Sequence, residues 1–411
     1  MKVLILNTSD HDGGAARAAY RLHDAISQSG IKSQMLVQKK TTLDSNIIVP
    51  KTFFYKYLLI FKSIIDFLPL IIYRNRKSQI FSTAWISSSQ IIRLINLIKP
   101  DIVHLHWINE GLLSLSDIKK IKYPIVWSLH DNWAFTGGCH VKGECERFMD
   151  SCGNCPILSS EFKYDLSWIN FHRKRSVYKS IIDRTTVVCL SDWMLQNAKK
   201  SKLLANFHTC KIPNPINSEF FRPLNKAQCR ELFSIPLDKK VILFGALNPT
   251  GDKNKGFYLL KESLKLIEDE NSIFVIFGAL EDSYLADLNF KYIKIEPLKD
   301  NLSLNVLYNT ADVFLVPSLQ ENLSNSIMES LSCGVPVVAF DTGGNSDLIV
   351  HRENGFLARK FDINDFSKGI IEMLYSLEYK KFSINARNSV VDKFDYKVIA
   401  RQYLALYKEL L

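Results

Sequence analysis

The stretch VFLVPSLQENLSNSIMESLSCGVPVVAFDTGG, residues 313–344, decides the fold. It reads as a strand, a loop, a helix, a second strand and a glycine turn. The apolar run VFLV is typical of a buried strand, and the helix that follows begins with N–H groups that have no partner inside the helix. A helix that begins beyond the carboxyl end of a parallel strand favours anion binding.

Two carboxylates, Glu321 and Glu329, lie near the start of the helical part. If both stand on the helix, their spacing is close to two helical turns and they project from much the same face. Gly343 and Gly344 follow the second strand, where glycine allows the backbone to approach a ligand closely. The alternative interpretation is an ordinary strand-helix-strand unit with solvated acids.

Length and composition place the chain among two-domain globular proteins. It has 411 residues, of which 47% are hydrophobic and 23% charged, which is typical of an α/β protein. The net charge of +10 is concentrated in residues 1–205, which hold 28 Lys and Arg against 16 Asp and Glu and so carry +12, leaving −2 for the remainder. A basic half suits nucleic acid, a membrane surface or an anionic acceptor. Because no nucleic-acid-binding motif accompanies it, we expect no nucleic acid partner.

The amino-terminal sequence predicts a Rossmann-like start. KVLILN, residues 2–7, is a buried-strand pattern, and a glycine turn leads into an alanine-rich helix over residues 15–29. VLILN is too short for a secretory apolar core, so we expect a cytoplasmic protein whose eight cysteines are thiols or metal ligands.

Two further strand patterns, IVHLHW at 102–107 and IVWSLHD at 125–131, end in polar residues. Ligands gather at the carboxyl ends of strands in an open parallel sheet. We therefore expect His106, His130 and Asp131 to lie nearer a site than random core residues. TTVVCLS at 185–191 reads as the last strand of the first domain, with Asp192 as the N-cap of the next helix.

The most apolar stretch covers residues 53–77. Lys62 and Asp66 interrupt it and Pro69 breaks it, so we do not expect a transmembrane helix. Its aliphatic and aromatic bulk, followed by basic residues, fits a helix lying in the interface of an anionic membrane. The alternative is a core helix of the first domain.

Four cysteines follow His130 within 17 residues: Cys139, Cys145, Cys152 and Cys155. Four thiols in a reducing compartment can form a closed tetrahedral zinc site that staples a loop lacking its own core. Their spacing differs from that of paired CxxC knuckles, and His140 is a substitute ligand. Unligated thiols are the alternative.

The segment 211–224, with three prolines and no periodicity, reads as a linker, and VILFGAL at 241–247 begins a second domain. In the loop after that strand, Lys253 and Lys255 stand just before a helix expected from Gly256. A cation together with a helix N-terminus can grip a diphosphate and stabilise a leaving phosphate without a metal ion.

The segment 318–344 resembles the donor-binding signature of the retaining glycosyltransferases of family 4, which have the GT-B architecture. In that family E-x7-E precedes a small-Gly-x-Pro-Val-Val strand and a Gly-Gly turn. The resemblance implies that Glu321 contacts the transferred sugar and that Glu329 binds the ribose hydroxyls of the nucleotide. Leu323 and Ser324 stand where Phe-Gly is frequent in the family, at a place that governs donor selectivity.

The resemblance covers nearly the whole chain. It implies that His130 lies near the donor sugar and that the glycine turn at Gly14 faces the donor phosphates and the acceptor. Lys255 matches the family's phosphate-binding lysine, whereas Ala246 or a neighbour stands where the family has an arginine. Asn325, at the start of the donor helix, is a further expected contact of the nucleotide sugar.

We therefore predict an α/β protein of two facing Rossmann-like domains with an interdomain cleft, the GT-B fold. The first, acceptor-side domain would cover residues 1–212, and by resemblance the terminal helix 394–411 would pack back on it. The second, nucleotide-sugar-binding domain would cover residues 213–393.

The implied function is retaining transfer of a hexose from a UDP- or GDP-sugar to a glycan or lipid-linked glycan at the inner membrane face. Surface polysaccharide synthesis, as of O-antigen, lipopolysaccharide, capsule or exopolysaccharide, is the expected setting. The absence of an Asp-x-Asp signature agrees with catalysis that requires no metal cofactor. A GT-B nucleotide-sugar epimerase and a phosphorylase are the enzymatic alternatives, and a phosphorylase is disfavoured because no lysine stands in a pyridoxal-type context. A catalytically silent membrane-associated scaffold is the other alternative.

Overall fold

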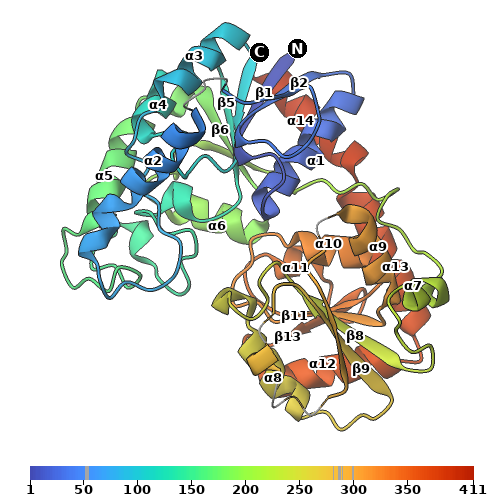
Figure 1. Cartoon of the computed structure of the whole chain (residues 1–411). Coiled ribbons are helices and arrows are strands. Elements are labelled where there is room, and N and C mark those ends of the chain that lie inside the picture. The colour runs from blue at the N-terminus through green and yellow to red at the C-terminus, as the bar shows by residue number, and fades with distance from the viewer. Residues whose placement is uncertain (51–54, 281, 286–287, 289, 299) are drawn as a thin grey trace. The chain divides into compact units, whose positions relative to one another are not determined.

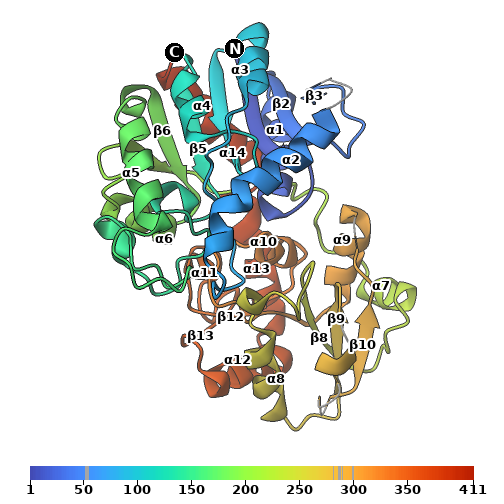
Figure 2. The ribbon, with the colours of Figure 1, turned by 60° about the vertical axis from the view of Figure 1, so that its left-hand side comes forward.

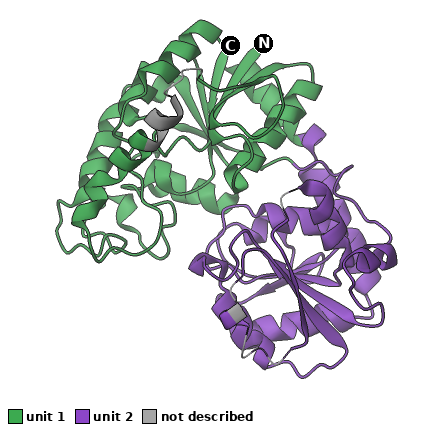
Figure 3. Ribbon diagram, viewed as in Figure 1, with its two compact units in different colours: residues 1–215, 399–411 green, residues 216–398 purple. Residues whose placement is uncertain are grey.

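The computed structural model describes residues 1–50, 55–280, 282–285, 288, 290–298 and 300–411. The chain divides into two compact α/β units, whose elements are labelled in Figure 1 and which are coloured separately in Figure 3. Unit 1 comprises Met1–Pro215 and Ile399–Leu411, and unit 2 comprises Ile216–Val398. These boundaries differ by a few residues from those expected at 212/213 and 393/394.

Unit 1 is built on a parallel sheet in the order β3-β2-β1-β4-β5-β6-β7. The strands are β1 (Lys2–Ser9), β2 (Lys32–Lys39), β3 (Ile47–Ile48), β4 (Ile102–Leu105), β5 (Ile125–Leu129), β6 (Thr185–Cys189) and β7 (His208–Lys211). The helices are α1 (Gly14–Gln28), α2 (Tyr55–Phe67), α3 (Ser89–Ile98), α4 (Leu115–Lys120), α5 (Leu166–Tyr178), α6 (Asp192–Lys200) and α14 (Tyr396–Glu409), the last of which belongs to unit 1 from Ile399 onward.

Two local expectations for unit 1 are wrong. The strand β6 is not the last, because β7 adds an edge strand whose four residues are too few and too polar to show a strand pattern. The N-cap of α6 is Ser191 rather than Asp192, since the Ser191 hydroxyl accepts the Met194 N–H at 3.1 Å. Asp192 instead occupies the first helical turn, where a carboxylate is also favourable.

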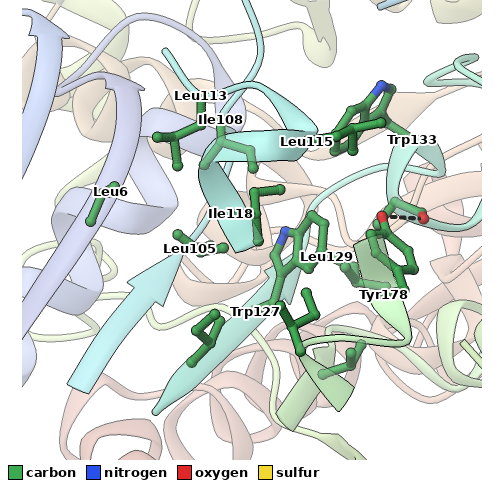
Figure 4. Close-up of a cluster of buried hydrophobic side chains, with 14 of the residues drawn as sticks. Leu6, Leu105, Ile108, Leu113, Leu115, Ile118, Trp127, Leu129, Trp133 and Tyr178 are labelled. Atoms are coloured by element: carbon green, nitrogen blue, oxygen red, sulfur yellow. Dashed lines mark hydrogen bonds between the residues drawn. The ribbon is translucent and has the colours of Figure 1, made fainter. Parts of the chain in front are cut away.

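A core of aliphatic and aromatic side chains fills the space between the central strands and the helices α3 to α6 (Figure 4). Trp127 and Tyr178 pack edge to face with ring centres 5.7 Å apart. The Tyr178 hydroxyl donates to the Ala134 carbonyl at 2.8 Å, so this buried aromatic group leaves no unsatisfied donor. This core supports the loops that follow β4 and β5.

Helix α14 is fastened to the sheet of unit 1 by buried hydrogen bonds. His104 on β4 lies between the Tyr407 hydroxyl, 2.7 Å from Nδ1, and the Ser128 hydroxyl, 2.8 Å from Nε2. Ser128 also pairs with the Tyr403 hydroxyl at 2.9 Å. Because all these groups are buried, each polar atom depends on the others for its partner.

Unit 2 contains a second parallel sheet, in the order β10-β9-β8-β11-β12-β13. Its strands are β8 (Lys240–Gly245), β9 (Ser272–Phe277), β10 (Tyr292–Ile295), β11 (Val313–Val316), β12 (Val337–Phe340) and β13 (Gly355–Ala358). Its helices are α7 (Lys226–Leu232), α8 (Phe257–Lys265), α9 (Asn301–Thr310), α10 (Asn325–Ser332), α11 (Asn345–Leu348), α12 (Ile363–Tyr375) and α13 (Tyr379–Lys393).

Asp312, just before β11, joins α7 to the sheet of unit 2. Its carboxylate pairs with Arg230 and Lys226, each at 2.8 Å, and accepts the Val241 N–H at 2.7 Å. Burial by itself would raise the pKa of Asp312, but Lys226 and the other hydrogen-bonding partners outweigh it and hold that pKa below its ordinary value. The charged form of Asp312 therefore stabilises unit 2 above pH 4 and loses this contribution as the pH falls through the depressed pKa.

We expect Asp312→Asn to lower the free energy of unfolding of unit 2 by about 3 kcal/mol, because it leaves the buried Arg230 without its counter-charge. Urea unfolding followed by circular dichroism and by hydrogen exchange in β8 measures this loss. The control is Glu262→Gln, which breaks an exposed pair with Lys265 and should cost about 0.5 kcal/mol or less. Equal effects of the two substitutions would contradict the assignment.

The buried histidine predicts acid sensitivity in unit 1. Burial, with a smaller effect of neighbouring His130, lowers the pKa of His104 to about 3. The unfolded chain binds this proton near pH 6.5 and the folded chain does not, so stability falls as the pH drops from 6.5 towards 3. In His104→Asn, the loss of stability between pH 7.5 and pH 5 should be smaller by about 2 kcal/mol.

Tryptophan fluorescence suits this measurement, since all 6 tryptophans lie between residues 85 and 193, within unit 1. The comparison uses the change with pH, so a uniform destabilisation by the substitution does not affect it. A His104→Asn curve parallel to that of the wild type would show that His104 is not the proton-binding group.

Candidate functional site

Two loops of unit 2 are joined at the carboxyl edge of its sheet. One follows β8 and carries Lys255, and the other follows β11 and carries Glu321. The Leu319 N–H donates to the Asn254 carbonyl at 2.8 Å, and the Asn254 side-chain amide donates to the Gln320 carbonyl at 2.8 Å. These two hydrogen bonds hold the lysine loop against the glutamate loop.

Two glycines make this close approach of loops feasible. Gly256 has a φ of +69°, and a Cβ there would lie 1.9 Å from the Pro317 carbonyl oxygen. Gly343 has a φ of +59°, and a Cβ there would lie 1.8 Å from the Glu321 carbonyl oxygen. The same carbonyl accepts the Gly344 N–H at 2.9 Å. Any other residue at either glycine would have to displace backbone.

Lys255 and Glu321 form an ion pair in which the Lys255 Nζ lies 2.7 Å from the Glu321 Oε1. The side chains are 31% and 15% exposed respectively, so the pair lies at the surface yet is partly shielded from water. Burial lowers the pKa of Lys255, but the facing Glu321 carboxylate outweighs this effect and raises the pKa above its ordinary value. The ammonium group is therefore charged at neutral pH and available to a second anion.

Glu329 does not share a helix with Glu321, and the conditional expectation of a common helix face is wrong. Helix α10 begins at Asn325, with Ser324 as its N-cap, and Glu321 lies in the preceding loop. That loop is held by the Gly343-Gly344 turn, a contact from beyond the second strand that helical spacing cannot reveal. The two carboxylates are thus positioned by different elements.

Glu329 is buried on α10 and accepts a hydrogen bond at 3.0 Å from the hydroxyl of Tyr308 on α9. The sequence reasoning missed Tyr308. The sequence shows a tyrosine in the segment before β11, but it does not indicate which face of α9 packs against α10. The Tyr308 hydroxyl thereby fixes the orientation of the Glu329 carboxylate.

The start of α10 offers backbone donors. The Ser324 side chain makes no capping hydrogen bond there, and the N–H groups of a first helical turn have no acceptor within the helix itself. Asn325 is the first helical residue, and Leu323 is a buried side chain just before the cap. These three residues lie within the loop and helix that also carry Glu321 and Glu329.

In unit 1, His130 follows β5 and pairs with His106, which follows β4. The distance from the His106 Nδ1 to the His130 Nε2 is 2.7 Å, and the rings are stacked with centres 5.0 Å apart. Burial is the main reason that the pKa of His130 falls to about 4, with nearby Asp131 opposing the shift, and burial also lowers that of His106 well below its ordinary value. Both imidazoles are therefore neutral at pH 7, and the N–H of one ring donates a hydrogen bond to the bare nitrogen of the other.

Asp131 and His140 form an ion pair in which His140 is buried and Asp131 is partly exposed. The Asp131 carboxylate accepts from His140 Nδ1 at 2.6 Å, from Trp107 Nε1 at 2.7 Å and from the Trp133 N–H at 2.8 Å. The other ring nitrogen of His140 lies 2.8 Å from the Ser82 hydroxyl. Because both nitrogens are engaged, His140 does not serve as the substitute metal ligand considered from the sequence.

The remaining candidates also lie in unit 1. Gly14 is the first residue of α1, after Gly13 with a φ of +89°, at the end of the loop that follows β1. The four cysteines of residues 139–155 line one hollow in the loop between β5 and α5. Burial raises the pKa of Cys139 to about 12, so its free thiol is a poor nucleophile. Within the described ranges, no three His, Cys, Asp or Glu side chains stand at metal-ligand spacing.

The structure thus brings the candidates together in two groups. Unit 2 holds Lys255 and the residues from Glu321 to Glu329, with the Lys255 and Glu321 side chains in direct contact. Unit 1 holds Gly14, His130 and the cysteines.

Comparison with known sequences identifies related proteins. Residues 12–220 match Glycosyltransferase Family 4, and residues 238–376 match a family described as glycosyl transferases group 1. The chain is 26% identical over 317 residues to the UDP-Gal:alpha-D-GlcNAc-diphosphoundecaprenol alpha-1,3-galactosyltransferase of Escherichia coli, covering 74% of each protein.

Another relative is the N,N'-diacetylbacillosaminyl-diphospho-undecaprenol alpha-1,3-N-acetylgalactosaminyltransferase of Campylobacter jejuni. It is 28% identical over 204 residues, which cover 48% of this chain and 53% of that protein, so the chain spans about half of that relative's length.

Among solved structures, a glycosyltransferase from Rickettsia africae superposes with a TM-score of 0.70 at 16% identity, covering 100% of this chain and 98% of that one. The family 4 match covers more than half of the chain, and each unit has the parallel sheet of a Rossmann-like domain. The chain therefore belongs to glycosyltransferase family 4 and has the GT-B fold.

Proposed function

We propose that the chain transfers a hexose from a UDP- or GDP-sugar to a lipid-linked or oligosaccharide acceptor, with retention at the anomeric carbon and without a catalytic metal ion. The observation that carries the proposal is the Lys255–Glu321 ion pair, in which Glu321 lies four residues before the start of α10. Names of relatives support it, since those from E. coli and C. jejuni are named for sugar transfer to undecaprenol-linked sugars. Surface polysaccharide synthesis at the cytoplasmic face of the membrane is the proposed setting.

The donor diphosphate would bind between Lys255 and the first turn of α10. An ammonium group has three N–H donors, so Lys255 can retain its ion pair with Glu321 and also donate to a phosphate oxygen. The backbone N–H groups after Ser324 add partial positive charge without any side-chain movement. Both groups would stabilise the negative charge that develops on the leaving diphosphate.

The sugar and the ribose would be held by carboxylates. Glu321 would accept hydrogen bonds from hydroxyls of the transferred sugar. Glu329, oriented by Tyr308, would accept from the ribose hydroxyls. Leu323, buried before the cap, would limit the room beside the sugar.

We assign no covalent nucleophile. In the proposed step the bond from the anomeric carbon to the leaving phosphate oxygen breaks while the acceptor oxygen bonds to the same face of that carbon. The acceptor hydroxyl proton passes to the leaving phosphate oxygen, so the configuration is retained and no side chain changes its protonation state. Exclusion of water would favour transfer over hydrolysis.

The acceptor side is proposed to lie on a membrane. Among the described helices, none is long and apolar enough to cross a bilayer. The described part of the apolar stretch predicted from the sequence nevertheless exposes a row of large side chains; its first residues, Phe53 and Phe54, lie outside the described residues. We call this row the α2–η1 patch, and it comprises Phe61, Ile64, Phe67, Leu68, Ile71 and Ile72 from α2 and the 3-10 helix Leu68–Ile72.

Figure 2 shows α2 crossing the front of unit 1. The opposite side of this segment is anchored, because Leu70 is buried and the Asp66 carboxylate accepts from the Thr83 hydroxyl and the Trp85 N–H. Ile72 is 81% exposed, and Arg76 lies with its guanidinium 4.8 Å from the centre of the Phe67 ring. Apolar side chains beside cations match the acyl chains and head groups of an anionic lipid surface.

For the donor site, we expect Glu329→Gln to weaken nucleotide-sugar binding about tenfold to a hundredfold, because charge-assisted hydrogen bonds to the ribose contribute about 1.5–3 kcal/mol. Calorimetric titration with a panel of UDP- and GDP-sugars measures the change and identifies the nucleotide. Glu262→Gln, on the exposed face of α8, is the control and should bind as the wild type does.

Wild-type affinity in Glu329→Gln would contradict the ribose assignment. Failure of the wild-type chain to bind any nucleotide sugar would contradict the proposed transfer and favour the silent scaffold. Conversion of a bound nucleotide sugar to its epimer, without an acceptor, would favour the epimerase.

For the membrane, we expect the double substitution Ile71→Ser and Ile72→Ser to reduce binding to phosphatidylglycerol vesicles at least about tenfold, since burying each isoleucine contributes about 1.5–3 kcal/mol. Vesicle flotation measures the bound fraction. The matched control replaces the exposed Leu232 and Leu377 of unit 2 with serine and should bind as the wild type does. Unchanged flotation of the Ile71 and Ile72 variant would show that the α2–η1 patch does not contact lipid.

A further inference from the structure

The loop between η2 (Trp133–Phe135) and α5 has little regular structure to support it. Between Thr136 and Asp165 the only helical element is the short 3-10 turn η3 (Arg147–Met149). Cys152 and Asn154 both adopt a left-handed backbone, with φ of 54° and 46°. A loop of this length with strained turns needs a constraint beyond its own side chains.

Apolar burial supplies part of that constraint, including Phe148, which belongs to the main core of unit 1. The hydrophobic cluster beneath the loop contains six buried residues, two of which are themselves cysteines: Leu70, Phe81, Cys139, Cys155, Ile157 and Leu158. The backbone is nevertheless packed closely, since a Cβ at Gly138 would lie 2.4 Å from the Phe81 ring and one at Gly153 would lie 2.2 Å from the Lys163 carbonyl oxygen. Small domains that cannot bury more apolar area are commonly held by disulfides or metal ions.

All four cysteines of the loop line one hollow. Cys139, Cys145, Cys152 and Cys155 surround an empty volume of about 310 Å³, part of which is open to solvent. None of the four forms a disulfide. The other four cysteines, Cys189, Cys210, Cys229 and Cys333, do not line this hollow. The fold thus gathers four thiols that are spread over 17 residues of sequence.

A backbone donor is already directed at one of the sulfurs, since the Gly137 N–H donates to the Cys152 Sγ at 3.2 Å. Such outer hydrogen bonds orient thiolate ligands and stabilise their negative charge in metal sites.

Cations stand where a tetrathiolate would need them. Lys142 and Arg147 line the same hollow. Lys174 of α5 is fully buried and donates to the carbonyls of Trp133 and Thr136. Burial lowers its pKa to about 7, and nearby Cys139, Cys152 and Asp131 oppose that shift. A zinc ion with four thiolates carries a net charge of −2, which Lys142 and Arg147 would balance.

We propose that Cys139, Cys145, Cys152 and Cys155 bind one zinc ion that holds the loop together. On binding, the four thiols release four protons to solvent and form four Zn–S bonds, with no oxidation or reduction. As the side chains stand, their spacing is wider than that of a metal site. The ion therefore draws the sulfurs to about 2.3 Å from itself, in a closed tetrahedral shell that leaves no open position for substrate.

His140 connects the cysteine loop to the residues that follow β5. His140 follows the ligand Cys139 and pairs with Asp131, which follows His130. The Asn132 N–H also donates to the His140 carbonyl at 3.1 Å. The zinc site itself does not depend on the proposed transferase activity.

Elemental analysis of the full chain, purified under reducing conditions without added metal, tests the proposal. We expect about one zinc per chain in the wild type and a loss of most of it in Cys152→Ser and in Cys145→Ser. Cys229→Ser, which replaces a buried cysteine of unit 2, is the matched control and should retain the metal. Exchange of zinc for cobalt(II) should produce the intense absorption of a tetrahedral tetrathiolate.

Measurements on the wild type keep the proposal testable if a cysteine variant fails to fold. Removal of zinc by a chelator should lower the unfolding temperature of unit 1, followed by tryptophan fluorescence, and should expose four thiols to a chromogenic reagent. Full recovery should follow on adding zinc. A wild-type chain that contains no zinc and takes up no cobalt would overturn the proposal, as would disulfides among these four cysteines or equal zinc content in all variants.

Discussion

The hydrogen bond from the Gly344 N–H to the Glu321 carbonyl determines where the Glu321 carboxylate can reach, and the charged part of unit 2 depends on it. The bond forms only because Gly343 has no Cβ and turns through a left-handed conformation against the same carbonyl. A second glycine, Gly256, also has a left-handed conformation and lets the loop that carries Lys255 approach the Pro317 carbonyl. The Lys255–Glu321 pair is therefore positioned by backbone rather than by side-chain packing, so its geometry exists before any ligand arrives.

The two units present opposite kinds of polar edge. In unit 2 Lys255 and Glu321 form an ion pair, and the facing carboxylate keeps Lys255 protonated. In unit 1 the two histidines that follow β4 and β5 are neutral at pH 7, since burial lowers the pKa of both His106 and His130. A charged edge suits a diphosphate, and a neutral edge suits sugar hydroxyls, which are hydrogen-bonded without being ionised. The proposed division into donor and acceptor sides follows this difference in chemistry.

The sequence predicted those parts of the fold that are carried by local patterns. Buried runs such as VFLV and the glycine turn after Phe340 lie where they were expected, because strand periodicity and glycine conformation are local properties. Contacts between distant segments were not accessible. The position of Glu321 outside α10 depends on Gly343, and the orientation of Glu329 depends on Tyr308. The pairing of His106 with His130 follows from strand order, which a single sequence does not encode locally.

The attachment of α14 to β4 has a consequence for the order in which the protein can be made. The hydrogen bond between His104 and Tyr407 joins residues 303 positions apart, and the whole of unit 2 lies between them. At ordinary rates of translation, the ribosome needs roughly 10 to 40 s to pass through unit 2 before α14 emerges. During that interval β4 and β5 lack the tyrosines that cover His104 and Ser128. The first unit to be synthesised is therefore the last to be completed.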